Sequence, residues 1–296
     1  MIMMLLVLLF FVGGANAALF FPTSQEKFNM NDTASSIQTH ELRQGLAQAD
    51  FVYYAYHHLE AGGSVGYYGV SVTMDVYALS LSNDQNSLAA VQISNGRDSI
   101  IRMAWEVYPR LYGGDSRSHL SAMWTNDGYR KTTCINTNCP IGFQPEAGAP
   151  FVLGDIIDPV SQSSGIRQSL TIKIIKDGAS GDWLLHCGLN QRDPALIGRF
   201  PKSLFTGGLA DRATIINIGG IAAGRTTDLP PMGSGYLPTN GTMATATAAS
   251  FSNILIFHEN GQSSLLPDNL PAYLTLPDAY SASPVIKGKF FYGGPS

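Results

Sequence analysis

The sequence has few charged residues. Of its 296 residues only 14% are Asp, Glu, Lys or Arg, whereas about 25% is usual in soluble domains. The formal net charge is −4, and no more than two basic residues are adjacent, at Arg130 and Lys131. A nucleic-acid-binding surface needs a basic patch or stripe, so we predict no nucleic-acid partner. Hydrophobic residues make up 45% of the chain, which excludes a disordered protein.

The sequence also lacks an apolar run long enough to cross a membrane, which takes about 20 residues. The most apolar run, Met1 to Val12, is followed by two glycines and the triplet Ala15-Asn16-Ala17. A short apolar core that ends in such a triplet is typical of a cleaved secretory signal peptide, although no Lys or Arg precedes this one. We therefore predict a secreted, extracellular protein with a signal peptide over 1–17, a short pro-segment or linker over 18–50, and no other membrane association.

Cysteine is scarce, with three residues in the whole chain. In an oxidising compartment Cys134 and Cys139 can close a small loop as a disulfide. The same spacing could hold half of a zinc site, but no second Cys/His pair follows at a suitable distance, so we favour the disulfide. Cys187 lies in an apolar stretch and is expected to be a buried, small hydrophobic residue. Asn31 and Asn240 begin sequons and are predicted glycosylation sites.

Metal and cofactor motifs are also missing. The nearest pair of histidines, His57 and His58, is adjacent in the sequence, and adjacent residues of a strand point to opposite faces. Gly-x-Ser-x-Gly does not occur, and there is no nucleotide-binding glycine fingerprint. We predict no metal and no cofactor, and these motifs alone identify no catalytic group.

The pattern that is present consists of short strands. From Tyr68 to Leu79 apolar and polar residues alternate, so that Val70, Val72, Met74 and Val76 share one side. Further strand-like runs are Leu88–Ile93, Ile100–Tyr108, His119–Thr125, Leu170–Ile175, Trp183–Gly188, Thr214–Ile218 and Ile254–Phe257. Only Pro201–Leu209 resembles a helix. Many strands without alternating helices predict a single all-β domain over 51–296, an antiparallel sandwich or barrel.

Several longer strings resemble the neprosin family. They are Trp105-Glu106-Val107-Tyr108-Pro109, Leu111-Tyr112-Gly113-Gly114-Asp115, Trp124-Thr125-Asn126-Asp127-Gly128-Tyr129, Cys134 with Cys139-Pro140, Gly198-Arg199-Phe200-Pro201, Met232-Gly233-Ser234-Gly235 and Phe291-Tyr292-Gly293-Gly294-Pro295. They follow the family's order and together cover about residues 51–296. The resemblance implies an antiparallel β-sandwich with a cleft across one sheet. It also implies a secreted glutamic endopeptidase that cleaves after proline at acid pH and uses two glutamates.

Both glutamate positions implied by the resemblance carry other residues. The first position lies three residues before the signature Trp105 and is occupied by Arg102. The second is the last residue of the string Ile218-Gly219-Gly220-Ile221 and is occupied by Ile221. In the implied mechanism one carboxylate activates a water and a second, protonated carboxyl stabilises the oxyanion and the leaving nitrogen. Arginine cannot act as a base, and isoleucine can do neither task. If the correspondence is right, positions 102 and 221 should face each other.

The resemblance offers five candidates for residues lining the cleft: Trp105, Glu106, Tyr112, Trp124 and Tyr129. For the tryptophans, a place in the sheet core is the favoured alternative, and the tyrosines could instead cover a sheet edge. Glu106 shares a face with Arg102 but lies about 13 Å farther along the strand, so only a β-bulge would let it replace the missing glutamate.

Three functions follow as hypotheses. The chain is a peptidase-like protein with impaired catalysis, a non-catalytic protein that binds a peptide, a proline-rich protein or a cell-wall polymer, or a copy without a retained role. In the second case the charge of Arg102 would favour acidic ligands.

Overall fold

The computed structural model describes residues 51–63, 65–162, 165–190, 192–238 and 247–295. The predicted signal peptide, the predicted pro-segment and the sequons at Asn31 and Asn240 lie outside these ranges. Within them no helix is both long and apolar enough to cross a membrane.

The first of two antiparallel sheets has seven strands, in the order β15-β1-β11-β3-β4-β5-β6. Their bounds are β1 Phe51–Glu60, β3 Gln85–Asn95, β4 Ser99–Val107, β5 His119–Thr125, β6 Cys134–Ile135, β11 Ile215–Gly224 and β15 Ala272–Leu274. The central pairs β1–β11, β11–β3 and β3–β4 run without a register shift. The positions of side chains on this sheet can therefore be read directly from the strand pairing.

The second sheet has ten strands, in the order β12-β17-β13-β2-β8-β9-β10-β7, with β14 paired to β13 and β16 to β17. Their bounds are β2 Gly69–Asp75, β7 Gln144–Pro145, β8 Ser169–Lys176, β9 Trp183–Leu189, β10 Ala195–Phe200, β12 Met232–Gly233, β13 Ala249–Phe257, β14 Ser263–Leu265, β16 Ser281–Ala282 and β17 Phe290–Gly294. The predicted helix at Pro201–Leu209 consists of two short 3-10 turns, η2 (Lys202–Leu204) and η3 (Gly208–Ala210).

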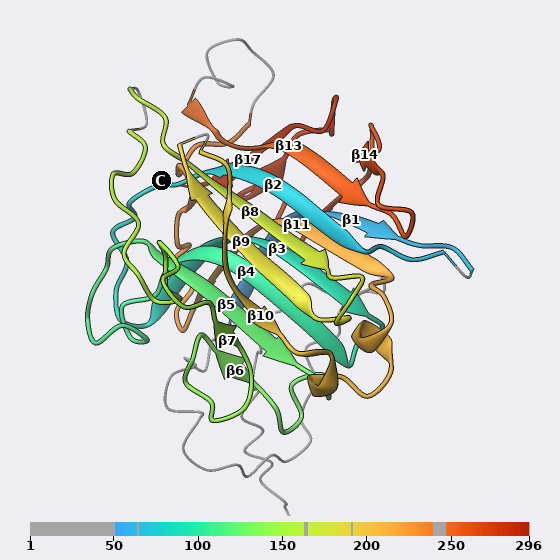
Figure 1. Ribbon diagram of the computed structural model, residues 1–296. Coiled ribbons are helices and arrows are strands. Elements are labelled where there is room, and N and C mark those ends of the chain that lie inside the picture. The colour runs from blue at the N-terminus through green and yellow to red at the C-terminus, as the bar shows by residue number, and fades with distance from the viewer. Residues whose placement is uncertain (1–50, 64, 163–164, 191, 239–246, 296) are drawn as a thin grey trace, which may run out of the picture.

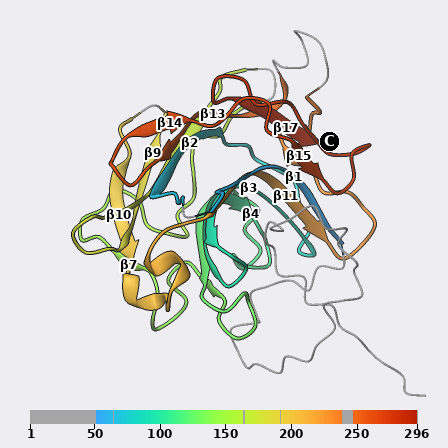
Figure 2. The same ribbon diagram turned by 90° about the vertical axis from the view of Figure 1, so that its right-hand side faces the viewer.

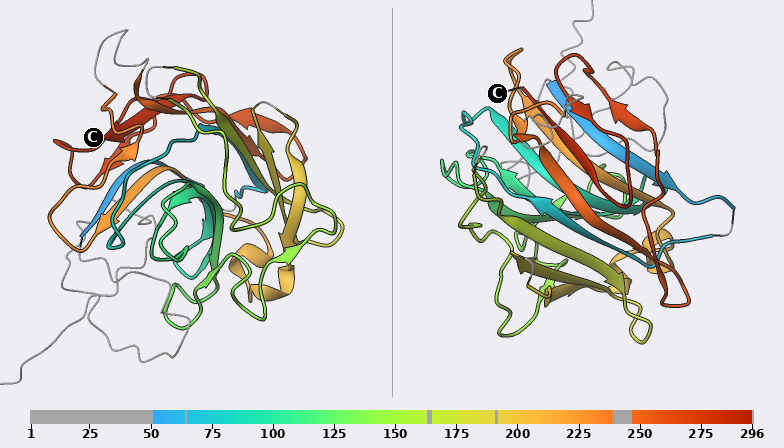
Figure 3. Two further views of the ribbon diagram at one scale, coloured as in Figure 1. Left: turned by 90° about the vertical axis from the view of Figure 1, so that its left-hand side faces the viewer. Right: turned by 90° about the horizontal axis from the view of Figure 1, so that it is seen from above.

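The two sheets form a sandwich. Figure 1 shows the strands of both layers running along nearly the same diagonal, as in aligned sheet packing. Seen end-on, the ten-stranded sheet wraps around the seven-stranded one (Figures 2 and 3). The predicted all-β antiparallel sandwich is therefore confirmed, and the chain does not close into a single barrel.

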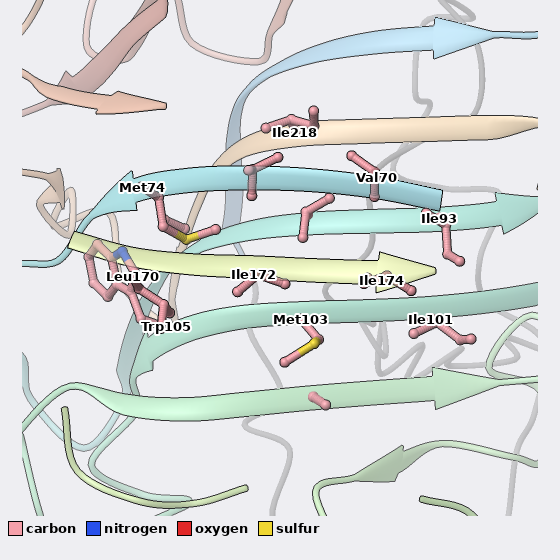
Figure 4. Packing of buried hydrophobic residues seen from close by; sticks show 14 of the residues in the cluster. Val70, Met74, Ile93, Ile101, Met103, Trp105, Leu170, Ile172, Ile174 and Ile218 are labelled. Atoms are coloured by element: carbon pink, nitrogen blue, oxygen red, sulfur yellow. The ribbon is translucent and has the colours of Figure 1, made fainter. Parts of the chain in front are cut away.

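The core between the sheets is built from alternate strand residues. The predicted buried side of β2, with Val70, Val72 and Met74, is fully buried and packs in one cluster with Ile101 and Met103 of β4 (Figure 4). Alternation follows from the pleat, which turns successive side chains to opposite faces. The remaining side chains of β4 must therefore point away from the ten-stranded sheet.

We call this second face of the seven-stranded sheet the inner face, because it lies on the inside of the bend (Figures 2 and 3). On β4 it carries Ile100, Arg102, Ala104 and Glu106, and all nine residues of the strand are buried. Strands that are buried on both faces read as nearly continuous apolar runs. An arginine and a glutamate are unusual in such a strand, and they mark this face of the sheet as a candidate functional surface.

Two strands of this sheet differ from the sequence prediction. The prediction named no strand at Phe51–Glu60, which forms β1, and it ended the later strand at Ile218, whereas β11 continues to Gly224. Gly219 and Gly220 are the reason, because glycine has a low intrinsic preference for strands. Here it is required: a Cβ on Gly219 would lie 2.3 Å from the carbonyl oxygen of Ala55 on β1.

Candidate functional site

One level of the inner face carries four polar side chains side by side. His58 of β1 pairs with Asn217 of β11, Asn217 pairs with Gln92 of β3, and Gln92 pairs with Arg102 of β4. We call these four residues the polar row. Three of them, Asn217, Gln92 and Arg102, are buried, with at most 3% of their surface exposed.

A second level, four residues away along the strands, is mainly apolar. Ile221 of β11 lies opposite Leu88 of β3, which lies opposite Glu106 of β4. Ile221 and Leu88 belong to a small buried cluster with Tyr56, Ala90, Ala104 and Ala223. Tyr54 of β1 is paired with Ile221 on its other side, so the neighbours of Ile221 on the inner face are hydrocarbon and tyrosine side chains, without a carboxylate beside it.

The prediction that positions 102 and 221 face each other is wrong, so the correspondence of both residues with the family's two glutamates does not hold in this structure. Arg102 is level with Asn217, whereas Ile221 is four residues farther along β11 and two strands away. With about 3.3 Å per residue and about 4.8 Å per strand, the two Cα atoms are roughly 16 Å apart. The residues paired with Ile221 on its two neighbouring strands are Leu88 of β3 and Tyr54 of β1.

Carboxylates are scarce on this sheet. Among its strands as the structure describes them, only Glu60 and Glu106 are acidic. Glu60 of β1 is level with Ile100 of β4, which comes six residues before Glu106. The strand of Glu60 is three strands away from the strand of Glu106. That offset is about 20 Å along the strands and about 14 Å across them. The two carboxylates cannot hold one water between them.

Glu106 is buried, with 3% of its surface exposed. Burial raises the pKa of its carboxyl above the usual value, although Arg102, a hydrogen bond from Ser121 and His119 act in the opposite direction. His119 lies directly opposite on β5, and its ring stacks on Tyr112 with 3.8 Å between the ring centroids. A buried carboxyl of raised pKa can serve as a proton donor or acceptor, but a second acid is missing beside it.

The five cleft candidates divide between the two faces. Trp105 and Trp124 belong to the core between the sheets, where Trp105 Nε1 donates to the carbonyl of Asp75 at 2.9 Å. They therefore do not line the inner face. Tyr112 packs on His119, beside Glu106. The pKa of the Tyr129 phenol is raised above its usual value because the group is buried, and the positive charge of Arg102 reduces this increase.

Sequence reasoning missed the amides of the polar row. His58 Nδ1 lies 2.7 Å from Asn217 Oδ1, whereas Asn217 Nδ2 and both polar atoms of Gln92 find no hydrogen-bond partner in the described chain. The signal in the sequence was an Asn and a Gln at inward positions of two otherwise apolar strands. Buried side-chain amides almost always have a partner, and an ordered water or a ligand can supply it.

The structure contains the predicted disulfide between Cys134 and Cys139, and Cys187 is buried with a free thiol. His57 points into the core against Phe290, whereas His58 points to the inner face, so the adjacent histidines separate as expected. Among the described residues no group of three or more His, Cys, Asp or Glu side chains could hold a metal ion.

Comparison with known proteins gives a family match. A family model described as Neprosin matches residues 83–295. This range includes Arg102, Glu106 and Ile221 and almost all of both sheets. None of the proteins with curated functions matches the sequence.

Solved structures with a similar course of the chain include two peptidases. Scytalido-glutamic peptidase, in complex with a peptide-based transition-state analogue, is 12% identical, with a TM-score of 0.45 over 83% of this chain and 100% of its own. SCP-B of the eqolisin family, bound to the tripeptide Ala-Ile-His, is 13% identical, with a TM-score of 0.40 over 83% of this chain and 100% of its own. A β-porphyranase from the human gut bacterium Bacteroides plebeius is 9% identical, with a TM-score of 0.28 over 60% of this chain and 66% of its own.

Proposed function

Since the chain belongs to the neprosin family, we propose that it is a secreted protein with the framework of a glutamic prolyl endopeptidase and impaired catalysis. The observation that carries this proposal is the distribution of acids on the seven-stranded sheet. Its two carboxylates, Glu60 and Glu106, lie on different levels and three strands apart. No pair of acids is available there to divide the roles of base and acid.

The remaining groups do not replace that pair. Arg102 is permanently protonated and cannot accept a proton, and Ile221 and Leu88 are hydrocarbon. Glu106 alone can take one role but leaves the other empty. General acid–base catalysis contributes about 10²–10⁴-fold to a rate, so the loss of either partner is severe.

Secretion is supported by two observations. The N-terminal residues have the pattern of a signal peptide, and Cys134 is joined to Cys139 in a disulfide, which is typical of an oxidising compartment. N-terminal sequencing of the protein from the medium of expressing cells should begin at Ala18. Retention in the cell with Met1 in place would contradict secretion.

A second candidate function is non-catalytic binding of a peptide, a proline-rich protein or a cell-wall polymer. The polar row supports it, because this row presents buried hydrogen-bonding groups on the same face of the sheet. Binding requires only complementary groups, whereas hydrolysis requires proton transfer in addition.

Incubation with a proline-rich protein between pH 2 and pH 6 tests the loss of hydrolysis. Mass spectrometry should find the substrate intact at every pH. A matched Glu106→Gln variant serves as the control, because any cleavage that this variant lacks would originate from the domain itself and would contradict the proposal.

A further inference from the structure

We propose that Lys176, in a pocket at one end of the ten-stranded sheet, is a reaction site for aldehydes, with which its amine forms an imine. None of the residues that line this pocket belongs to the seven-stranded sheet, so the inference does not rest on the loss of hydrolysis. It adds a modification site and the chemical class of the compound that modifies it.

The pocket lies between two hairpin turns of the ten-stranded sheet. The β8–β9 turn, residues 177–182, forms one wall, and the β13–β14 turn, residues 258–262, contributes to another. The volume is about 590 Å³, and sites for small molecules usually have about 300–1,000 Å³. A Cβ on Gly178 or Gly261 would meet no atom within 4 Å, so there is open space beside both turns. A small reactant can therefore reach the side chains that line the pocket.

Two backbone carbonyls hold the amine of Lys176. Its Nζ donates to the carbonyl oxygen of Gly181 at 2.7 Å and to that of Leu209 at 3.3 Å. Among the described residues no carboxylate forms an ion pair with this Nζ. A neutral amine has two N–H bonds and one lone pair. The two carbonyls can take both N–H bonds and leave the lone pair for an electrophile.

Burial and a second lysine favour the neutral form of this amine. Lys202 lines the same pocket, and its Cδ lies 2.9 Å from the Cβ position of Gly181, whose carbonyl oxygen binds Lys176. The pKa of Lys176 is lowered to about 8, mainly by burial and also by the charge of Lys202, whereas Asp211 and Asp182 act in the opposite direction. Lysines that form imines in enzymes are activated in the same ways, by desolvation or by a neighbouring cation.

The remaining neighbours do not replace these contacts. The ring centroid of Trp183 is 4.9 Å from Nζ, and this aromatic face favours the ammonium form. Its effect is smaller than that of burial and Lys202, since the pKa is lowered. The other ionisable groups of the pocket are each hydrogen-bonded to a residue other than Lys176: Asp177 to Ser180, Glu259 to Tyr68 and His258 to Ser264.

The charges around the pocket favour a neutral reactant. Lys176 and Lys202 are balanced by three carboxylates, those of Asp177, Asp211 and Glu259. Neither a small anion nor a small cation therefore meets a surface of opposite sign. An aldehyde carries no charge, and its carbonyl carbon is electrophilic.

The reaction needs no further reactant. The lone pair of Nζ attacks the aldehyde carbon, and the N–C bond forms while the π pair of the C=O bond moves to oxygen. One proton passes from nitrogen to this oxygen, which gives a carbinolamine. The hydroxyl then leaves as water with the second proton of nitrogen, and the product is an imine on Nζ.

Reductive labelling with glyceraldehyde tests this site. The protein is incubated at pH 7.5 with a limiting amount of glyceraldehyde and with cyanoborohydride, which reduces the imine to a stable secondary amine. Peptide mapping by mass spectrometry then identifies the labelled lysines. We expect Lys176 to be labelled about tenfold faster than the exposed Lys131, Lys287 and Lys289, because more of its amine is neutral at this pH. Labelling of Lys176 at the rate of the exposed lysines, or more slowly, would overturn the inference.

The unfolded chain is the first control. In guanidinium chloride the pocket is lost, so Lys176 should be labelled at the same rate as the other lysines. An advantage that persists in the unfolded chain would also overturn the inference, because the local sequence would then be its cause.

A pair of variants tests the part of Lys202. Lys202→Met removes the neighbouring charge, so the pKa of Lys176 rises and its labelling at pH 7.5 should decrease several-fold. Lys287→Met, at an exposed position between β16 and β17, should leave the labelling of Lys176 unchanged. Equal rates for Lys176 in both variants would contradict its activation by Lys202.

Discussion

Arg102 and Ile221 point to the same face of one sheet but lie two strands and four residue levels apart. The two positions that resemble the family's glutamates therefore do not form a facing pair in this chain. The residue opposite Ile221 is Leu88, and the one opposite Leu88 is Glu106. Among the described strands of this sheet, Glu106 is the one acid on the level of Ile221, and Leu88 and Tyr54, the residues paired with Ile221, carry no carboxylate.

Restoring glutamates at both positions should not create a peptidase. In the double variant Arg102→Glu and Ile221→Glu the new carboxylates would be roughly 16 Å apart, too far to share one water. We expect no cleavage of a proline-rich substrate between pH 2 and pH 6, measured on a variant whose far-UV circular dichroism matches the parent. Gain of cleavage would show that β3 pairs with β4 or with β11 in a different register.

Replacing Glu106 by Gln should stabilise the protein at neutral pH. Burial raises the pKa of Glu106 in the folded state above its unfolded value of about 4.3, so the folded state holds the proton more tightly. The contribution of this group to stability is present below that value and decreases as the pH rises through the window between the two pKa values. The difference in melting temperature between Glu106→Gln and the parent should therefore grow from pH 4 to pH 7. A difference that shrinks over this range would contradict the raised pKa.

Gly219→Ala should destabilise the fold through steric overlap on β1. A Cβ at this position would lie 2.4 Å from the Cα of Tyr56, which is backbone and cannot rotate away. We expect a loss of about 1–3 kcal/mol in the free energy of unfolding, measured by denaturant titration. Gly178→Ala is the matched control, because a Cβ there meets nothing within 4 Å. Equal stability of the two variants would show that the backbones of β1 and β11 are farther apart at Gly219 than in this structure.

The thiol of Cys187 should be unreactive in the native protein. Only 1% of its surface is exposed, and burial raises its pKa to about 12, so almost no thiolate is present at pH 8. Iodoacetamide at pH 8 should label no cysteine in the folded protein and one in guanidinium chloride without reductant. Labelling of three cysteines after unfolding would contradict the bond between Cys134 and Cys139.

The sequence predicted the fold class because period-two alternation is a local property. The buried side of β2, from Val70 to Met74, is a clear case. The full length of β11 was not predictable in this way, since the pair Gly219-Gly220 resembles a turn when its neighbours are unknown. In the sheet, these glycines instead allow the close approach of Tyr56 on β1 and of Met232 from the other sheet.

The candidate site was predictable only in part. Family strings drew attention to Arg102, Glu106 and Ile221, and all three lie on the inner face. Which of them are level depends on the register of β3 with both of its neighbours, and strand register is set by long-range pairing. Gln92 and Asn217 carry no motif, and only their pairing with Arg102 in three dimensions marks them.

A search for cleavage products in a mixed peptide library, read by mass spectrometry from pH 2 to pH 7, is the decisive test of whether this domain hydrolyses peptides. We expect the same peptides after incubation with the protein as after incubation with buffer. New termini that accumulate with time and disappear with Glu106→Gln would contradict it, because they would require a working acid pair on this sheet.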